Sequence, residues 1–166
     1  QISQGGIPAY YEREVAIDFI SPSRDNIVNR DFHPMVFQYG EEYLLDINIL
    51  ESVEPVYDEG VYTYLLGVKS EGAYGIGFIF DNFYLSENSN LFIYDIDKTM
   101  FLGSFTSENN KDSFVFPTSI TKGDHIIIET GSRSPSIFFY FGQNCKHIFN
   151  PTNLRKFLCV FTWFPK

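Results

Sequence analysis

Short apolar runs alternate with polar segments rich in glycine, proline, asparagine and serine along most of the chain. The runs have the length of β-strands, and none keeps the 3.6-residue period of an amphipathic helix behind a capping residue. Such runs between turn signals predict strands. Nine strands are expected, over residues 13–19, 43–49, 61–70, 74–83, 90–96, 100–105, 113–118, 124–130 and 136–142.

The run from Tyr74 to Phe83 has the clearest alternation of side-chain size. Successive residues of a strand point to opposite faces. One face of this strand is therefore bulky and the other is mostly glycine: Ile76, Phe78, Phe80 and Asn82 against Gly75, Gly77 and Ile79. A face of glycines predicts that another stretch of backbone crosses this strand closely.

A hairpin is predicted over Ile93–Gly103, with Asp95–Thr99 as its connection. Asp97 suits this turn because an aspartate side chain can bond to nearby backbone. Many short strands with regular turns predict an all-β fold, an antiparallel β-sandwich or jelly roll of about nine strands. We assign residues 1–150 to the sandwich and 151–166 to a C-terminal tail element, in which the run 155–164 suits either a strand or a short helix.

The composition supports a sheet and narrows the range of partners. The 166 residues include 18 Phe and 11 Tyr, which pack well on a pleated surface. The net charge of −9 disfavours binding to nucleic acid and to anionic membrane surfaces. No apolar run approaches the roughly 20 residues needed to span a bilayer.

The two cysteines and the first residues leave alternatives open. Cys145 and Cys159 could form one disulfide that closes a short loop, or remain buried free thiols. They lack the paired spacing of a zinc site. The opening "QISQGGIP" fits either a processed N-terminus or a trimmed chain.

The histidines do not lie in a recognisable catalytic context. His33, His125 and His147 are the three in the chain, and neither a GxSxG elbow nor the "GDSGG" setting of trypsin-like enzymes is present. His125, in "GDHIIIE", opens an apolar strand, which favours a turn or strand-edge role. We therefore predict no catalytic residue, no cofactor and no metal site.

Several carboxylates and glycines have a functional and a structural interpretation. Asp95 and Asp97 lie two apart and could face a calcium ion, but the EF-hand pattern is absent, so a solvated hairpin end is preferred. Glu41 with Glu42, and Glu51 with Glu54, are expected on a solvated face. "GAYGIG" (72–77) lacks a following basic residue, which favours close packing over phosphate binding.

Five short motifs follow one another in a fixed order between Val61 and Glu129. They comprise Ser70, Gly72 and Ala73; Phe80 and Phe83; Leu85, Leu91, Ile93 and Tyr94; Gly103, Phe105, Thr106, Asn109, Asn110 and Lys111; and Gly123, Asp124 and Glu129. With "QISQGGIP" and "FYFGQNCKHIFN" they cover most of residues 1–150. This order resembles the N-terminal, non-catalytic region of secreted bacterial serine proteases of the lysyl endopeptidase type. Glu87, Asn88 and Ser89 depart from that family's Pro and Gly-Ala.

The resemblance implies a secreted, periplasmic or cell-surface domain that is not an enzyme. The catalytic His, Asp and Ser motifs of the protease domain are not found in the chain, so protease activity is not implied. Its expected partner is a protein or an attached catalytic domain. One alternative is a carbohydrate-binding module, because jelly rolls rich in Tyr bind glycans. A weaker one is an enzyme using two carboxylates about 5–10 Å apart in a cleft.

Overall fold

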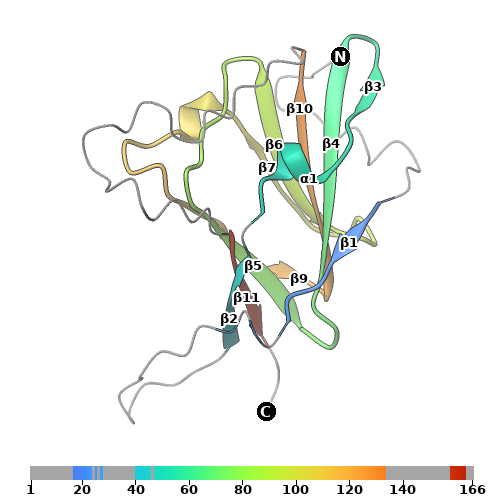
Figure 1. Ribbon diagram of the computed structural model, residues 1–166, viewed down its shortest axis with the longest axis vertical. Coiled ribbons are helices and arrows are strands. Elements are labelled where there is room, and N and C mark those ends of the chain that lie inside the picture. Colours follow the sequence, from blue (N-terminus) through green and yellow to red (C-terminus); the bar gives the residue numbers. More distant parts are fainter. Residues whose placement is uncertain are drawn as a thin grey trace.

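The computed structural model describes residues 17–23, 25, 27, 40–45, 47–133 and 158–163, with the backbone alone for Leu50 and for 158–163 (Figure 1). These residues are mostly strand, which confirms the all-β class. The strands are β1 (Phe19–Ile20), β2 (Gly40–Leu45), β3 (Val56–Asp58), β4 (Val61–Lys69), β5 (Gly75–Phe80), β6 (Ser89–Asp95), β7 (Phe101–Phe105), β8 (Phe116–Pro117), β9 (Thr121–Lys122), β10 (His125–Ser132) and β11 (Leu158–Trp163). A four-residue helix, α1 (Ile49–Ser52), and a 3-10 turn, η3 (Ser107–Asn109), complete the described elements.

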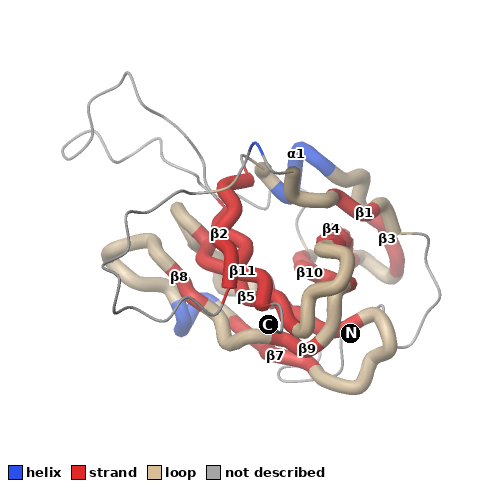
Figure 2. Tube along the Cα trace, turned by 90° about the horizontal axis from the view of Figure 1, so that it is seen from below, coloured by secondary structure: helices blue, strands red, loops and turns tan. Residues whose placement is uncertain are grey.

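The strands form two sheets. The first sheet has the order β1-β4-β10-β6-β7, with β3 also paired to β4. The second sheet has the order β2-β11-β5-β8, with β9 also paired to β5. In the described chain only β1 and β4 run parallel, and the other pairs are antiparallel. The view in Figure 2 shows β2, β11 and β5 side by side, with β4 and β10 in the other layer.

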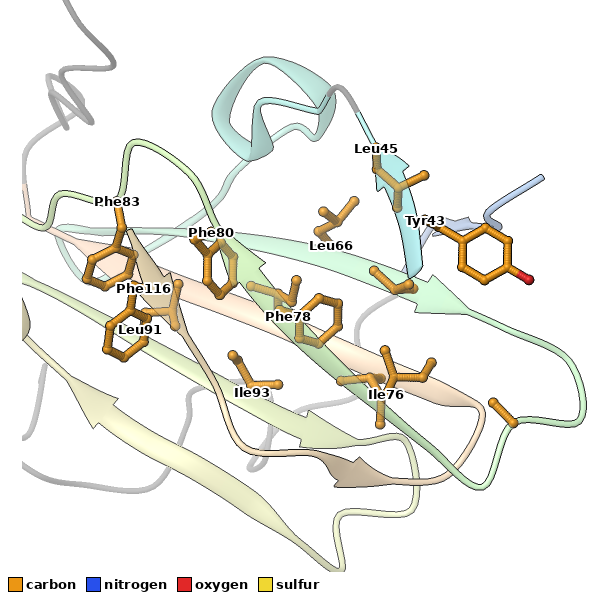
Figure 3. Close-up of a cluster of buried hydrophobic side chains, with 14 of the residues drawn as sticks. Tyr43, Leu45, Leu66, Ile76, Phe78, Phe80, Phe83, Leu91, Ile93 and Phe116 are labelled. Carbon is orange, nitrogen blue, oxygen red and sulfur yellow. The ribbon is translucent and has the colours of Figure 1, made fainter. Parts of the chain in front are cut away.

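One hydrophobic core lies between the two sheets. Alternate residues of β5 face it from the second sheet, and alternate residues of β4, β6 and β10 face it from the first (Figure 3). These side chains are Ile76, Phe78 and Phe80 on one side and Leu66, Val68, Leu91, Ile93, Ile126 and Ile128 on the other. Phe83 and Phe116 stack with their ring centroids 4.3 Å apart at one end of this core. Each such side chain contributes roughly 1.5–3 kcal/mol by leaving water.

The first sheet also buries residues on its opposite face. Leu65, Phe92, Tyr94 and Ile127 form a second cluster there, against which Ile17 and Phe19 pack. The Tyr94 hydroxyl donates a hydrogen bond of 2.7 Å to the buried carboxylate of Glu129. This contact satisfies two polar groups that would otherwise be costly to remove from water.

Most of the predicted strands are present, with corrections at their ends. The strand expected over 43–49 ends at Leu45, and α1 begins at Ile49 instead of continuing it. Asn48 is a residue type favoured before a helix, and its carbonyl accepts from the amides of Glu51 and Ser52. The expected number of strands is too low, because β3 and β9, of three and two residues, were not predicted. The run 136–142 lies outside the described residues.

The C-terminal run adopts the strand alternative. β11 pairs antiparallel with β2 on one side and with β5 on the other, so it is an interior strand of the second sheet. Its register places Val160 opposite Tyr43 and Phe78. Strands far apart in the sequence are therefore neighbours within one sheet.

The glycines of β5 are closely approached by another stretch of backbone, as expected, but residues 119–121 run antiparallel beside this strand and do not cross it. A Cβ atom added to Gly75 would lie 2.6 Å from Ile120 Cγ2 and 3.0 Å from the Thr121 carbonyl oxygen. At Gly77 the nearest atom is Ile120 Cγ1, at 3.4 Å. Gly75 thus leaves room for Ile120, so that residues 119–121 lie close beside β5 and β9 pairs with it.

Gly75→Ala is expected to destabilise the fold by about 1–3 kcal/mol, because the new methyl group overlaps Ile120 and the Thr121 backbone. Gly77→Ala is the matched control, and it should change stability by less than about 1 kcal/mol because its methyl group makes ordinary contacts. Urea unfolding of both variants measures the difference. Equal stability of the two variants would contradict the close approach of Ile120 and Thr121 to Gly75.

Candidate functional site

Two of the sequence motifs meet where β4 leads into β5 and β9 leads into β10. The Ser70 amide donates to the Asp124 carbonyl at 2.8 Å, and the Gly123 amide donates to the Tyr74 carbonyl at 2.9 Å. The Gly72 amide donates to Asp124 Oδ2 at 3.3 Å. Gly72 and Gly123 have φ of 79° and 108°, in the region that favours glycine. We call these five residues the Asp124 clasp.

His125 lies beside this clasp as the first residue of β10, which confirms its predicted position at a strand edge. Its Nδ1 and Asp124 Oδ1 share a hydrogen bond of 2.6 Å. Its ring meets the Phe19 ring edge-on, with 5.4 Å between the centroids. The contacts of this imidazole are thus a carboxylate and a phenyl ring.

The hydrogen bond with His125 is the main reason that the pKa of Asp124 is lower than its ordinary value. Burial opposes this lowering of the pKa, and the Gly72 amide adds to it. The side chains of His125 and Asp124 remain 28% and 38% exposed, so water weakens their attraction. The pair therefore braces a surface loop.

Asp95 organises the hairpin between β6 and β7, although Asp97 was expected to do so. The buried Asp95 carboxylate accepts hydrogen bonds from the Thr99 amide, the Thr99 hydroxyl and the Met100 amide, at 3.0, 2.8 and 2.6 Å. Asp97 is exposed in the turn. The solvated hairpin end that was expected for both carboxylates is therefore correct for Asp97 and wrong for Asp95, which is buried by its contacts with the turn. Among the described residues no group of three or more His, Cys, Asp or Glu could hold a metal ion.

The motif "GSFTSENNK" braces a loop. Asn110 Oδ1 accepts from the Leu85 amide and Asn110 Nδ2 donates to the Leu85 carbonyl, both at 2.8 Å. Thr106 and Asn109 form a capping box around η3, in which the Thr106 amide donates to Asn109 Oδ1 at 2.9 Å. These polar side chains therefore replace missing backbone partners across a loop.

The predicted solvated faces are correct for one pair of glutamates and wrong for the other. Glu51 and Glu54 are exposed. Glu41 and Glu42 are half-buried because they belong to β2, and the Tyr43 hydroxyl donates to Glu41.

The hairpin of β3 and β4 carries an exposed aromatic surface that the sequence analysis missed. Tyr57 pairs with Tyr62 across the two strands, and their ring centroids are 4.7 Å apart with planes tilted by 42°. Tyr57 is 62% exposed, the highest value among the large hydrophobic side chains that the structure describes. We call the side chains of Tyr57, which is exposed, and of Tyr62, which is partly exposed, the tyrosine face. The β3–β4 hairpin that carries it lies near the top of Figure 1.

Three carboxylates flank Tyr57 in the sequence. Glu54 and Glu59 are exposed, and Asp58 is partly exposed in the same hairpin. The pKa of the neighbouring Tyr64 is raised mainly by burial, and then by Tyr62 and by the negative charge of Glu54. The field of Glu54 therefore reaches this row of tyrosines.

A charge asymmetry along the chain could have drawn attention to this region. Eight of the 21 acidic residues lie between Arg30 and Lys69, and none of the 12 Lys and Arg residues lies there. The remaining chain holds 13 acidic and 12 basic residues, so it is almost neutral. Nearly all of the excess negative charge therefore belongs to the segment that includes the hairpin.

Other candidate residues lie outside the described part of the chain. These are His33, His147 and Cys145. Cys159 lies in β11, where only the backbone is described, so the pairing of the cysteines stays open. No helix among the described residues is long and apolar enough to cross a membrane.

Comparison with known proteins gives no relative for this chain. No family model, no curated protein and no solved structure matches it.

Asn110→Ala is expected to destabilise the fold by about 1–3 kcal/mol, because it leaves the amide and carbonyl of buried Leu85 without their side-chain partner. Asn88→Ala serves as the control at an exposed position and should have little effect. Thermal and urea unfolding report both changes. If the Asn110 variant were as stable as the control, Asn110 would not brace the loop.

Asp124→Asn should lower the free energy of unfolding by about 0.5–1.5 kcal/mol at neutral pH, because an amide oxygen cannot replace both carboxylate contacts. The folded-state pKa of Asp124 is depressed, so this stabilisation is complete above the ordinary aspartate pKa of about 3.9. It is lost as the pH falls through the lower folded value.

The difference between wild type and variant, measured by urea unfolding from pH 7 to pH 2, should therefore shrink below about pH 4. Asp112→Asn, at an exposed carboxylate, should show no comparable change. A difference that stayed constant down to pH 2 would contradict the role of the charge.

Proposed function

We propose that the chain is a non-catalytic β-sandwich of the jelly-roll type that binds a protein partner through the tyrosine face. A core shared by two sheets supports the sandwich. The order of the sequence motifs supports kinship with the accessory region of lysyl endopeptidase-type proteases, and with it a secreted, periplasmic or cell-surface location. The partner is then a separate protein or an attached catalytic domain.

The exposure of Tyr57 on a regular hairpin is the observation that carries this proposal. Its ring is 62% exposed, yet it packs against Tyr62 on a neighbouring strand. Aromatic side chains are enriched in protein interfaces, and Tyr loses little conformational entropy when it is bound. A ring that is already held by a neighbour loses still less. The face therefore has the chemistry and the rigidity of an interface anchor.

The contacts of the polar motif residues support a non-catalytic role. Thr106 and Asn109 hold backbone groups of their own loop, and Asp124 and Asn110 hold backbone groups of neighbouring loops. His125 is engaged by Asp124 and by Phe19. Residues engaged in this way determine the shape of the domain and present no activated nucleophile.

A protein suits the face better than a sugar ring does. Stacking against a flat sugar face favours rings that lie in one plane, whereas the two tyrosine rings are tilted by 42°. Tilted rings present a ridge that fits between side chains of a partner. Glycan binding is therefore the alternative outcome of the test.

The proposal is tested on a peptide array with basic, acidic, neutral and aromatic sequences, alongside a glycan array. Wild type, Tyr57→Ala and Tyr84→Ala are compared, since Tyr84 is 39% exposed outside the hairpin. We expect saturable peptide binding that Tyr57→Ala weakens by at least about 10-fold and Tyr84→Ala leaves unchanged. Saturable glycan binding, or peptide binding that does not depend on Tyr57, would refute the proposed binding face.

Catalytic activity is tested separately with lysine esters and peptide substrates. We expect no turnover above that of a buffer blank. Turnover that a serine-protease inhibitor abolishes would overturn the non-catalytic role.

A further inference from the structure

We infer that the tyrosine face recognises a segment rich in lysine or arginine on the partner protein. This inference rests on the proposed function, and adds to it the chemistry of the partner. It follows from two features that occur together at the hairpin, the exposed side chain of Tyr57 and the exposed carboxylates of Glu54 and Glu59.

The geometry suits a cationic side chain. The outer surface of the Tyr57 ring is open to solvent, and Tyr62 supports the ring from the adjacent strand. A Lys or Arg group within about 6 Å of such a ring is attracted to its face. The exposed carboxylates of Glu54 and Glu59 lie in the segments next to β3, where they can pair with further basic groups of the same segment.

Charge complementarity favours this occupant over a neutral or acidic one. Eight acidic residues and no Lys or Arg lie between Arg30 and Lys69 in the sequence, and Glu54 and Glu59 are exposed beside β3. The pKa of Tyr64 is raised mainly by burial and next by Tyr62, and the negative charge of Glu54 adds to this rise. An acidic peptide would meet like charges at this surface, which costs free energy and slows encounter.

The opposite end of β4 provides a matched control. Glu71 is exposed and lies beyond Lys69, whereas the tyrosine face lies at the Val61 end of this nine-residue strand. The two ends are about 26 Å apart at the usual rise of a strand. This separation is several times the screening length of about 8 Å at physiological salt. Removing the charge of Glu71 should therefore not change the affinity of the tyrosine face for a peptide.

The test uses three fluorescent 12-residue peptides in which serine alternates with lysine, glutamine or glutamate. Anisotropy titrations compare wild type, Tyr57→Ala, Tyr57→Phe, the double variant Glu54→Gln/Glu59→Gln, and Glu71→Gln. Circular dichroism and melting temperature confirm that each variant is folded. All titrations are repeated at about 50 and 300 mM salt.

We expect the lysine peptide to bind best, and to bind more weakly at the higher salt concentration. The double variant and Tyr57→Ala should each weaken binding of the lysine peptide by about 10-fold. The affinities of Tyr57→Phe and Glu71→Gln should stay within about twofold of wild type. Lysine-peptide binding that the double variant leaves unchanged would overturn the inference. So would equal affinity for the glutamine peptide.

The two levels of the proposal fail in different ways. Tyr57-dependent binding of the glutamine or glutamate peptide at least as tight as that of the lysine peptide refutes the inference and preserves the proposed function. Failure of every peptide class to bind in a Tyr57-dependent manner refutes both.

Discussion

The packing of β5 against the first sheet is the contact on which the rest of the described structure depends. One side of β5 faces the core through Ile76, Phe78 and Phe80. On its other side, Gly75 and Gly77 allow residues 119–121 to lie close beside the strand. The same strand therefore joins the two sheets and receives β9. The segment that follows β9 then enters the Asp124 clasp, so the loops that carry the sequence motifs are positioned by this one strand.

The core-facing side of β4 leads along the strand to the tyrosine face, where the side chains reach solvent. Residues of one face of β4 become more exposed in the order Val68, Leu66, Tyr64 and Tyr62. Tyr57 then adds its ring from β3. The helix α1 lies against β4 in this region, with Ile49 and Val53 packed on the core. The aromatic pair is thus attached to a strand, β4, that is buried over most of its length, and this limits the freedom of the pair to move before binding.

The sequence was informative wherever a local pattern determined the outcome. Alternation over Tyr74–Phe83 predicted both the buried face and the glycine face of β5. His125 was placed correctly at the start of an apolar strand. The resemblance of the motifs to a protease accessory region stays a prediction, although the structure assigns those polar residues contacts within loops.

The missed features depend on contacts that a local pattern does not contain. Asn110 and Leu85 are 25 residues apart, so their pairing becomes visible only in the fold. Which aspartate organises the hairpin depends on where β6 ends, and this favours Asp95 over Asp97. The exposure of Tyr57 depends on the three-residue strand β3, which is too short to be recognised by alternation. The charge asymmetry between Arg30 and Lys69 was visible in the sequence. It could be connected to a binding face only after the structure showed that Tyr57 is exposed.

Titration of the 15N-labelled protein with a lysine-rich peptide, followed by amide chemical shifts, tests the binding face most directly. The account predicts saturable shifts centred on residues 54–63 of the β3–β4 hairpin, with the amides of the Asp124 clasp unaffected. Shifts centred on the clasp or spread evenly over both sheets, or no saturable shifts, would contradict it.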